Sequence, residues 1–250
     1  MPPITSDALV LRTYKLGETS KVVVLLTRER GKVRAVAKGA RGARSRYQSS
    51  LEPLSEVRVG LHGRQGAELM RLGACDLIRS AFLVGGREPE SRLALSYYAE
   101  LLDAFAQEGE VEDAVYRLAL AVLRAAEGDT PGMGLARYLE AWLLRLHGLY
   151  PSLERCAGCA GPLAEGELSY HRVTHGFVCP ACEPASGPVL SRGARSLLER
   201  IFKTPPADFA VEASAAAELE RFQGDLIAAH LERELRSRRV LREVARDVRG

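Results

Sequence analysis

The chain has 250 residues, of which 46% are hydrophobic and 27% charged, so it is long enough for two globular modules around a sizeable core. Its longest apolar runs, such as residues 22–26 and 118–123, are too short to cross a bilayer, and its opening residues lack the basic and apolar regions of a signal peptide. We therefore expect a cytoplasmic protein with no membrane partner. The net charge of +3 indicates no partner by itself.

Short segments rich in Val and Leu follow one another through the first part of the chain, separated by turn-forming residues. They are residues 7–14, 19–28, 32–38, 56–61 and 68–75. Few helical signals interrupt them, which favours a small antiparallel barrel, and the OB-fold is the five-stranded barrel. We therefore predict an OB-fold over residues 1–80, as the first part of an α+β protein.

Positive charge is concentrated in one part of this predicted barrel. Residues 28–46 contain eight basic side chains and one acid, Glu29, a charge of +7, which leaves −4 for the rest of a chain whose total is +3. A cationic patch on a mildly acidic body is typical of a protein that binds a polyanion. A basic loop that only aids solubility is the alternative, but solubility requires no clustering.

Strand alternation would place several of these charges on the outside of the barrel. In residues 32–38, Lys32, Arg34 and Lys38 share one face, and small apolar side chains share the other. The next segment, residues 39–47, is small, flexible and cationic, as suits a loop that orders on a phosphate backbone. Tyr47 of this segment, or Tyr14, could stack on a base; packing is the alternative for both and the better explanation for Tyr14. The residues predicted to contact nucleic acid are Lys32, Arg34, Lys38, Arg41, Arg44, Arg46 and Tyr47.

The periodicity changes from strand to helix at about residue 91. Apolar residues at helical spacing predict helices over residues 91–109, 111–127, 130–148 and 191–202, and a long amphipathic stretch from about residue 214. Thr130 and Pro131 suit the N-cap and the first turn of the third helix. A second basic run, diluted by three acids, covers residues 233–249. The predicted helical domain comprises residues 81–151 and 188–250.

Two C-x₂-C pairs, Cys156 with Cys159 and Cys179 with Cys182, are separated by nineteen residues. This spacing is typical of a structural zinc site, because each tight turn points two thiolates at one metal ion. Four thiolates leave no open coordination position, so we predict one structural Zn²⁺ in a module over residues 152–187. Two disulfides and redox C-x-x-C chemistry are the weaker alternatives.

Other residue types that could carry chemistry have plainer interpretations. His171 and His175 lie between the cysteine pairs, but four thiolates make them unnecessary as ligands, and the lone Cys75 is best explained as a small core residue. The sequence contains no P-loop, no H-E-x-x-H motif and no G-x-S-x-G motif. We therefore predict a protein that is not an enzyme. A metal-dependent nuclease with unrecognised carboxylates is one alternative.

Several short motifs resemble those of the RecO family, in the same order along the chain. The N-terminal part carries Gly17-Glu18-x-Ser20, Thr27-x-x-x-Gly31, Lys38-Gly39 and Ser45-Arg46. A second stretch runs from Arg137-Tyr-Leu-Glu140 through His147-Gly148 and Pro151 to Cys156-x-x-Cys159. The resemblance extends from about residue 6 to residue 185.

The resemblance implies an OB-fold, a helical domain and, in many members, a zinc module. It implies a DNA repair and recombination mediator that binds single- and double-stranded DNA and anneals complementary strands. With its partner RecR, such a mediator helps to load RecA onto strands covered by the single-stranded-DNA-binding protein SSB. It also implies association with the bacterial nucleoid. An RNA- or ribosome-associated OB module with a structural zinc knuckle is the main competing interpretation.

The helix after Thr130 is a candidate for binding a protein partner. Its apolar stripe uses Leu135, Leu139, Trp142 and Leu146, whereas Arg137 and Leu144 share a different face with Arg145 beside them. A cation next to apolar surface suits an acidic peptide that ends in a hydrophobic residue, which is what the resemblance implies for the SSB tail. The alternative is that Arg137 and Leu144 are buried, with Arg137 paired to Glu140.

Overall fold

The computed structural model describes residues 3–47, 49–64, 67–83, 89–127, 132–182, 186–209 and 213–247. Contacts divide the chain into two compact units, one formed by Met1–Glu127 with Leu235–Gly250 and the other by Gly128–Glu234. The division into three modules predicted from the sequence remains a prediction.

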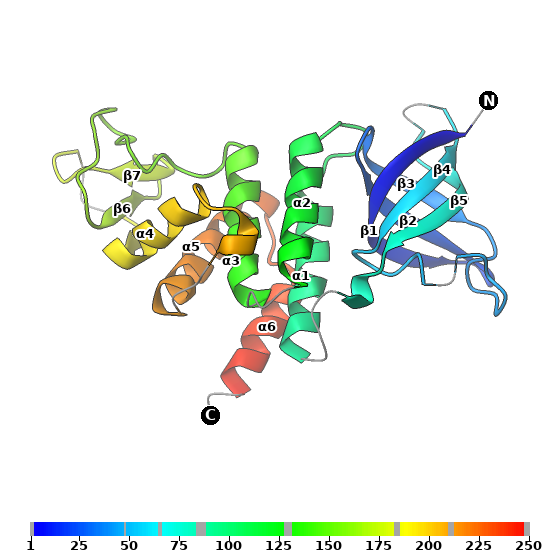
Figure 1. Cartoon of the computed structure of the whole chain (residues 1–250). Helices are drawn as coiled ribbons and strands as arrows, with labels where there is room; N and C mark the ends of the chain where they lie inside the picture. The colour runs from blue at the N-terminus through cyan, green and yellow to red at the C-terminus, as the bar shows by residue number, and fades with distance from the viewer. Residues whose placement is uncertain are drawn as a thin grey trace. The chain divides into compact units, whose positions relative to one another are not determined.

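The first unit contains a closed barrel of five strands (Figure 1). The strands are β1 (Ile4–Leu16), β2 (Ser20–Thr27), β3 (Gly31–Ala37), β4 (Glu56–His62) and β5 (Met70–Arg79). Their order is β1-β2-β3-β5-β4, closed by pairing of β4 with β1, and only the short β3–β5 contact is parallel. This is the OB-fold, and each strand overlaps a segment predicted from the sequence.

Alternating side chains fill the barrel, because successive residues of a strand point to opposite faces. Ala8 and Val10 of β1, Val23 and Leu25 of β2, and Val59 of β4 are fully buried in one cluster. Cys75 lies partly buried against this cluster, as expected for a small core residue.

The turn between β2 and β3 is pressed against the segment that joins the first two long helices. Gly31 has φ +63°, and a methyl group there would lie 1.6 Å from the carbonyl oxygen of Glu110. The backbone N–H of Lys32 donates to the carbonyl oxygen of Gln107 (3.2 Å), and that of Gly109 donates to Lys32 (3.1 Å). Only glycine fits this position, since it combines a left-handed conformation with no space for a side chain.

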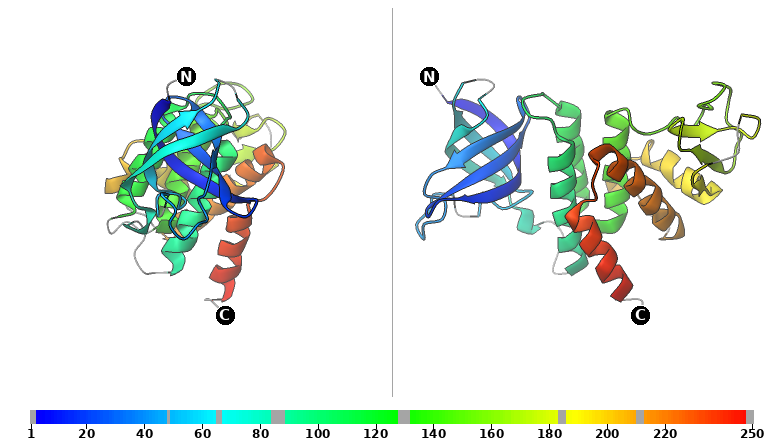
Figure 2. Two further views of the ribbon diagram at one scale, coloured as in Figure 1. Left: turned by 90° about the vertical axis from the view of Figure 1, so that its right-hand side faces the viewer. Right: turned by 180° about the vertical axis from the view of Figure 1, so that it is seen from behind.

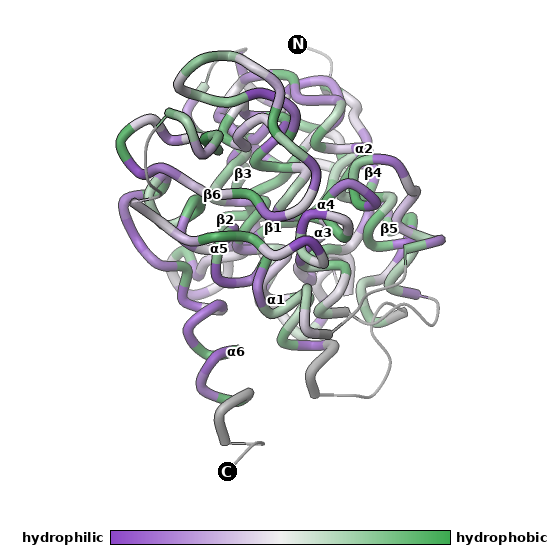
Figure 3. The backbone as a smooth tube through the Cα atoms, turned by 90° about the vertical axis from the view of Figure 1, so that its left-hand side faces the viewer, coloured by the Kyte–Doolittle hydropathy of each residue, from purple (hydrophilic) through white to green (hydrophobic). Residues whose placement is uncertain are grey.

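Helical elements complete the first unit: η1 (Ala81–Leu83), α1 (Pro89–Phe105), α2 (Asp113–Ala125) and α6 (Arg236–Asp247). α6 lies against α1 (Figure 2), with Leu235 buried just before the helix begins. The Glu100 carboxylate on α1 accepts hydrogen bonds from the backbone N–H groups of Arg236 and Ser237. This acid caps the N-terminus of a helix that is otherwise mostly hydrophilic (Figure 3).

The second unit combines three helices with a small sheet. Its elements are α3 (Gly132–Leu146), β6 (Leu168–His171), β7 (Gly176–Val178), β8 (Val189–Leu190), α4 (Arg192–Ile201), η2 (Pro206–Asp208) and α5 (Ala213–Leu231). The sheet has the order β7-β6-β8. Edge-to-face rings of Tyr150, Phe202, Phe222 and Tyr170 link the sheet to α4 and α5.

The helices predicted over residues 91–109, 111–127, 130–148 and 191–202 are confirmed in type and approximate extent, whereas the long stretch predicted from about residue 214 forms two helices, α5 and α6. Ser191 caps α4, because its side chain accepts from the backbone N–H of Ala194 at 3.2 Å. The predicted start of the third helix at Thr130 and Pro131 lies outside the described residues. Among the described helices, none is long and apolar enough to cross a membrane.

Candidate nucleic-acid interface and metal centre

The two cations of β3, Lys32 and Arg34, lie on the outside of the barrel, and acids of the same unit neutralise both of them. The ammonium of Lys32 lies 2.7 Å from the carbonyl oxygen of Asp103 and 3.6 Å from its carboxylate. Arg34 forms an ion pair of 2.5 Å with Glu108. Both side chains lie on the outer face of the strand, as its alternation predicted. Their pairing with Asp103 of α1 and with Glu108, just after α1, was not predicted.

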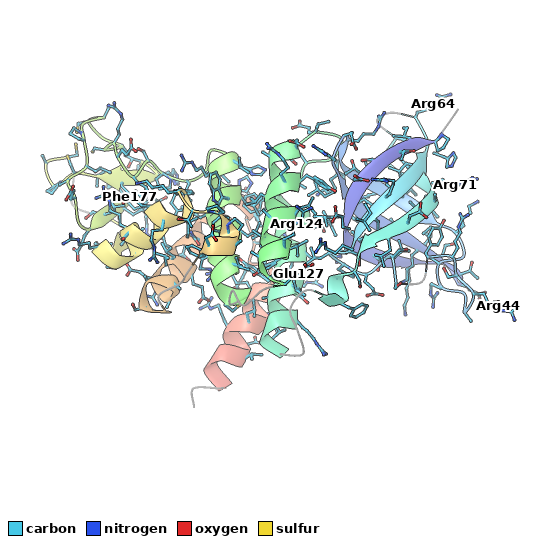
Figure 4. All side chains as sticks on the ribbon, viewed as in Figure 1. Arg44, Arg64, Arg71, Arg124, Glu127 and Phe177 are labelled. Carbon is cyan, nitrogen blue, oxygen red and sulfur yellow. The ribbon has the colours of Figure 1, made fainter. Side chains whose placement is uncertain are left out.

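The segment that follows β3 keeps its positive charge exposed. We call residues 38–46 the basic loop; its cations, all exposed, are Lys38, Arg41, Arg44 and Arg46. Arg41 holds the loop to the turn between β1 and β2, because its guanidinium donates to the carbonyl oxygen of Gly17 at 2.8 Å. Arg44 lies on the outside of the barrel and points into solvent (Figure 4). The loop therefore offers cations that no acid of the described residues neutralises.

The expectation that Tyr47 stacks on a base is corrected by its burial. Only 3% of the residue is exposed, and its ring belongs to the barrel core. Its hydroxyl donates to the carbonyl oxygens of Leu72 (2.9 Å) and Gly73 (3.1 Å) and accepts from Arg46 at 2.7 Å. A ring enclosed in this way has no free face for a base, so Tyr47 anchors the basic loop to β5.

A second group of basic side chains, not predicted from the sequence, lies at the β4–β5 hairpin. His62 ends β4, Arg64 lies in the connecting loop, and Arg71 lies near the start of β5. All three line a shallow cavity of about 470 Å³. The predicted fold could have indicated this group, because the loop between strands 4 and 5 is one of the oligonucleotide-binding loops of OB-folds.

The four cysteines of the two pairs converge in the second unit. Their sulfur atoms all lie within 4.8 Å of one another, and those of Cys159 and Cys179 are 3.8 Å apart. A disulfide bond would need about 2.05 Å between sulfurs, so the four are free thiols in a cluster that could hold a metal ion. A methyl group at Gly158 would lie 3.0 Å from the sulfur of Cys182, so this glycine lets the chain turn tightly beneath the sulfurs.

Backbone donors prepare one of these thiols for ionisation. Hydrogen bonds from the backbone N–H groups of Cys159 and Cys179 lower the pKa of the Cys156 thiol to about 6. Hydrogen bonds with the neighbouring thiols, that of Cys159 first, favour the protonated form of Cys182 and raise its pKa to about 12, so one thiol of the cluster favours ionisation while another resists it. A bound cation would remove this conflict, since it stabilises every thiolate of the cluster.

The intervening histidines lie outside the cluster. Among the described residues, the group of side chains close enough to share a metal ion comprises the four cysteines alone. The Nδ1 atom of His171, which is buried at the end of β6, instead lies 3.3 Å from the backbone nitrogen of Thr174.

The proposed partner site on α3 is corrected for two of its three residues. Leu144 is fully buried, and Arg137 is 3% exposed. The Arg137 guanidinium forms ion pairs with Glu140 at 2.5 Å and Glu220 at 3.6 Å. Both side chains are therefore packed inside the unit, because α3 is buried on a second face as well as along its apolar stripe. Arg145 alone is exposed.

Comparisons with known proteins agree with this architecture. The family model for the recombination protein O N-terminal region matches residues 1–81, and the one for its C-terminal region matches residues 88–239. A protein of Koribacter versatilis (strain Ellin345), named DNA repair protein RecO, is 35% identical over 233 residues, which cover 92% of this chain and 94% of the relative. A protein of Symbiobacterium thermophilum with the same name is 34% identical over 244 residues, 94% of this chain and 95% of the relative. These matches confirm the resemblance found in the sequence motifs: the chain belongs to the RecO family of DNA repair proteins.

Proposed function

We propose that this protein is a recombination mediator that binds single- and double-stranded DNA and promotes annealing of complementary strands. The observation that carries the proposal is the basic loop, which presents Lys38, Arg41, Arg44 and Arg46 on an OB barrel. Each phosphate that such a cation neutralises releases condensed counterions, which favours binding without regard to base sequence. This activity fits a protein that works in the cytoplasm at the bacterial nucleoid.

Annealing on this surface requires no chemical step. Formation of a duplex is itself downhill by about 1.4 kcal/mol per stacking step. The barrier is the mutual repulsion of two polyanions, and clustered cations reduce it by screening both strands. The protein therefore acts as a binding surface rather than as an enzyme.

The cysteine cluster fits Zn²⁺, which we propose as its ion, at one per chain. Zinc–sulfur bonds of about 2.3 Å at tetrahedral angles place sulfur atoms about 3.8 Å apart. The 3.8 Å between the sulfurs of Cys159 and Cys179 agrees with this geometry. Cys156, Cys159, Cys179 and Cys182 would fill all four positions, so the ion would hold the segment together and take no part in catalysis.

Membership in the family supports three protein partners: RecR, the SSB tail and, indirectly, RecA. For the SSB tail, the exposed Arg145 indicates a site that differs from the one predicted from the sequence around Arg137 and Leu144. Its guanidinium lies over the ring of Phe202 at 4.3 Å, beside a cavity of about 450 Å³ that Lys203 also lines. Glu154 and Glu199 line the same cavity, and Glu199 already pairs with Arg195. The two cations beside an aromatic wall suit an acidic peptide with an apolar C-terminal residue.

Fluorescence binding of an SSB-tail peptide tests this site. Arg145→Ala should weaken binding about 10-fold, the equivalent of roughly 1.4 kcal/mol. Arg221→Ala, which removes an exposed arginine of α5 outside the cavity lining, is the control and should bind as wild type does. Equal affinity of the Arg145 variant and the control would rule the site out.

An annealing assay tests the main proposal. Purified protein is mixed with two complementary oligonucleotides, one labelled, without nucleotide, and the rate of duplex formation is compared with the spontaneous rate. Acceleration is expected, and its absence would refute the proposal. Tighter binding of RNA than of DNA in a filter assay would favour the RNA-associated alternative, and cleavage products with Mg²⁺ would favour a nuclease.

A further inference from the structure

A histidine and an arginine lie side by side on the outer surface of the barrel. His62, the last residue of β4, pairs directly with Arg71 of β5. Arg64, in the loop between the strands, lines the same cavity of about 470 Å³. Arg71 and Arg64 both lie on the outside of the barrel in Figure 4. Three groups that can carry positive charge thus surround one shallow depression.

Acids that pair with other barrel cations form no ion pair with this cluster, although Glu68 and Glu108 line a neighbouring cavity with Arg64. On the same hairpin, Arg58 pairs with Asp7 at 2.8 Å, and Arg79 pairs with Glu127. Within the described part of the chain, His62, Arg64 and Arg71 take part in no ion pair or hydrogen bond of their side chains. Arg64 and Arg71 place two positive charges at one depression, so an anion bound between them would be favoured.

The position of the histidine is fixed by a glycine. A methyl group at Gly73 would lie 2.7 Å from Nε2 of His62 and 3.1 Å from the carbonyl oxygen of Gly60. The absence of a side chain at Gly73 therefore leaves room for the imidazole against the β5 backbone, beside the cavity that His62 lines.

The same stretch of β5 is joined to the basic loop. The Tyr47 hydroxyl donates to the carbonyl oxygens of Leu72 and Gly73, the two residues that follow Arg71. Arg46 lies over the Tyr47 ring, 4.8 Å from its centroid. Arg46, Tyr47, Gly73 and His62 therefore form a chain of direct contacts between the basic loop and the cavity.

We propose that His62, Arg64 and Arg71 bind one phosphate group of a DNA strand whose neighbouring phosphates lie on the basic loop. The inference rests on the proposed DNA binding and names a second contact point for it. Guanidinium groups suit this role, because their planar fork donates two parallel hydrogen bonds to a phosphate. The hairpin thus extends the DNA-binding surface beyond residues 38–46.

Salt dependence of binding tests the phosphate contact. Affinity for a labelled oligothymidylate is measured over a range of salt concentrations for wild type and for the Arg64→Gln/Arg71→Gln double variant. Loss of one contact to a single strand should flatten the slope of log K against log salt by about 0.7. Circular dichroism and thermal unfolding establish that the variant is folded.

Arg58→Gln and Arg79→Gln combined provide the matched control. This double variant removes the same charge from the same hairpin, but from arginines that acids already neutralise. Its slope should equal that of wild type. The inference is overturned if the Arg64/Arg71 variant keeps the wild-type slope, or if the control flattens the slope equally.

The size of the change in slope also tests whether the two arginines bind the same phosphate group. A flattening of about 1.4 would mean two separate contacts, and would contradict the single phosphate group. If wild type binds DNA while the Arg64/Arg71 variant keeps its slope, this inference alone fails. If wild type does not bind DNA, the proposed function fails and this inference with it.

Discussion

The hydroxyl of Tyr47 donates a hydrogen bond to the carbonyl oxygen of Leu72, 2.9 Å away, and so fastens the basic loop to β5. β3 pairs with β5 only through Met70 and Arg71, which leaves the following backbone of β5 without a strand on that side. The tyrosine supplies hydrogen bonds where that pairing stops. It also accepts a hydrogen bond from Arg46, so the position of a cation of the basic loop depends on a buried ring.

Tyr47→Phe tests this anchoring role. The variant keeps the buried ring but leaves the Leu72 and Gly73 carbonyl oxygens without their donor. Unfolding in urea should show a loss of about 1 kcal/mol, the usual net contribution of such a hydrogen bond. Tyr14→Phe is the control, because Tyr14 is 41% exposed and should change stability by less than about 0.5 kcal/mol. Equal stability of the two variants would contradict the anchor.

The metal centre gives a second prediction. Wild-type protein should contain about one zinc ion per chain, and Cys156→Ser should lose it, because three thiolates and a hydroxyl form a much weaker site. Protease digestion should then cleave within residues 151–188 faster than in wild type. Cys75→Ser, which lies outside the cluster, should keep its zinc. A full complement of zinc in Cys156→Ser would refute the assignment.

Zinc retention should also depend on pH. Protons compete with the metal for the thiolates, so zinc is held at neutral pH and released as the pH falls. The pKa of Cys156 is lowered to about 6 even without a cation, so this thiolate should be protonated at lower pH than that of Cys182, whose pKa is raised to about 12. Metal release during an acid titration, followed with a chromogenic chelator, measures this. Release that accelerates with rising pH would contradict thiolate ligation.

The basic loop gives a fourth prediction. Neutralising Lys38, Arg41 and Arg44 together should flatten the slope of log K against log salt for duplex DNA by about 2–3, at up to 0.9 per contact. Lys32→Gln with Arg34→Gln should have a smaller effect, because Asp103 and Glu108 already neutralise both cations. The reverse order of effects would move the interface from the loop to the face of β3.

The buried ion pair on α3 gives a fifth prediction. Arg137→Met should lower the free energy of unfolding by about 3–5 kcal/mol, since Glu140 would remain buried without its cation. Replacing both residues, as Arg137→Met with Glu140→Leu, should restore much of the loss because the fully buried carboxylate is removed, while Glu220, which also loses Arg137, is 35% exposed to solvent. Urea unfolding of the two variants checks this. A double variant less stable than the single one would contradict the argument.

Local patterns in the sequence predicted most of the architecture. All five strands and the described helices follow from periods of two and 3.6 residues and from turn-forming residues, because these depend on neighbours in the chain. The convergence of Cys156, Cys159, Cys179 and Cys182 also followed from spacing, since each tight turn fixes two sulfurs at once.

By itself, therefore, the sequence determined the barrel, the helices, the thiol cluster and the presence of a cationic segment. Only the tertiary structure decided which cations remain available. Lys32 and Arg34 meet acids some seventy positions away, Tyr47 turns into the core, and Arg137 and Leu144 are covered by packing. His62 and Arg71 become neighbours only when β4 pairs with β5. The physical reason is that the charge and exposure of a side chain depend on partners distant in sequence, which periodicity and spacing do not encode.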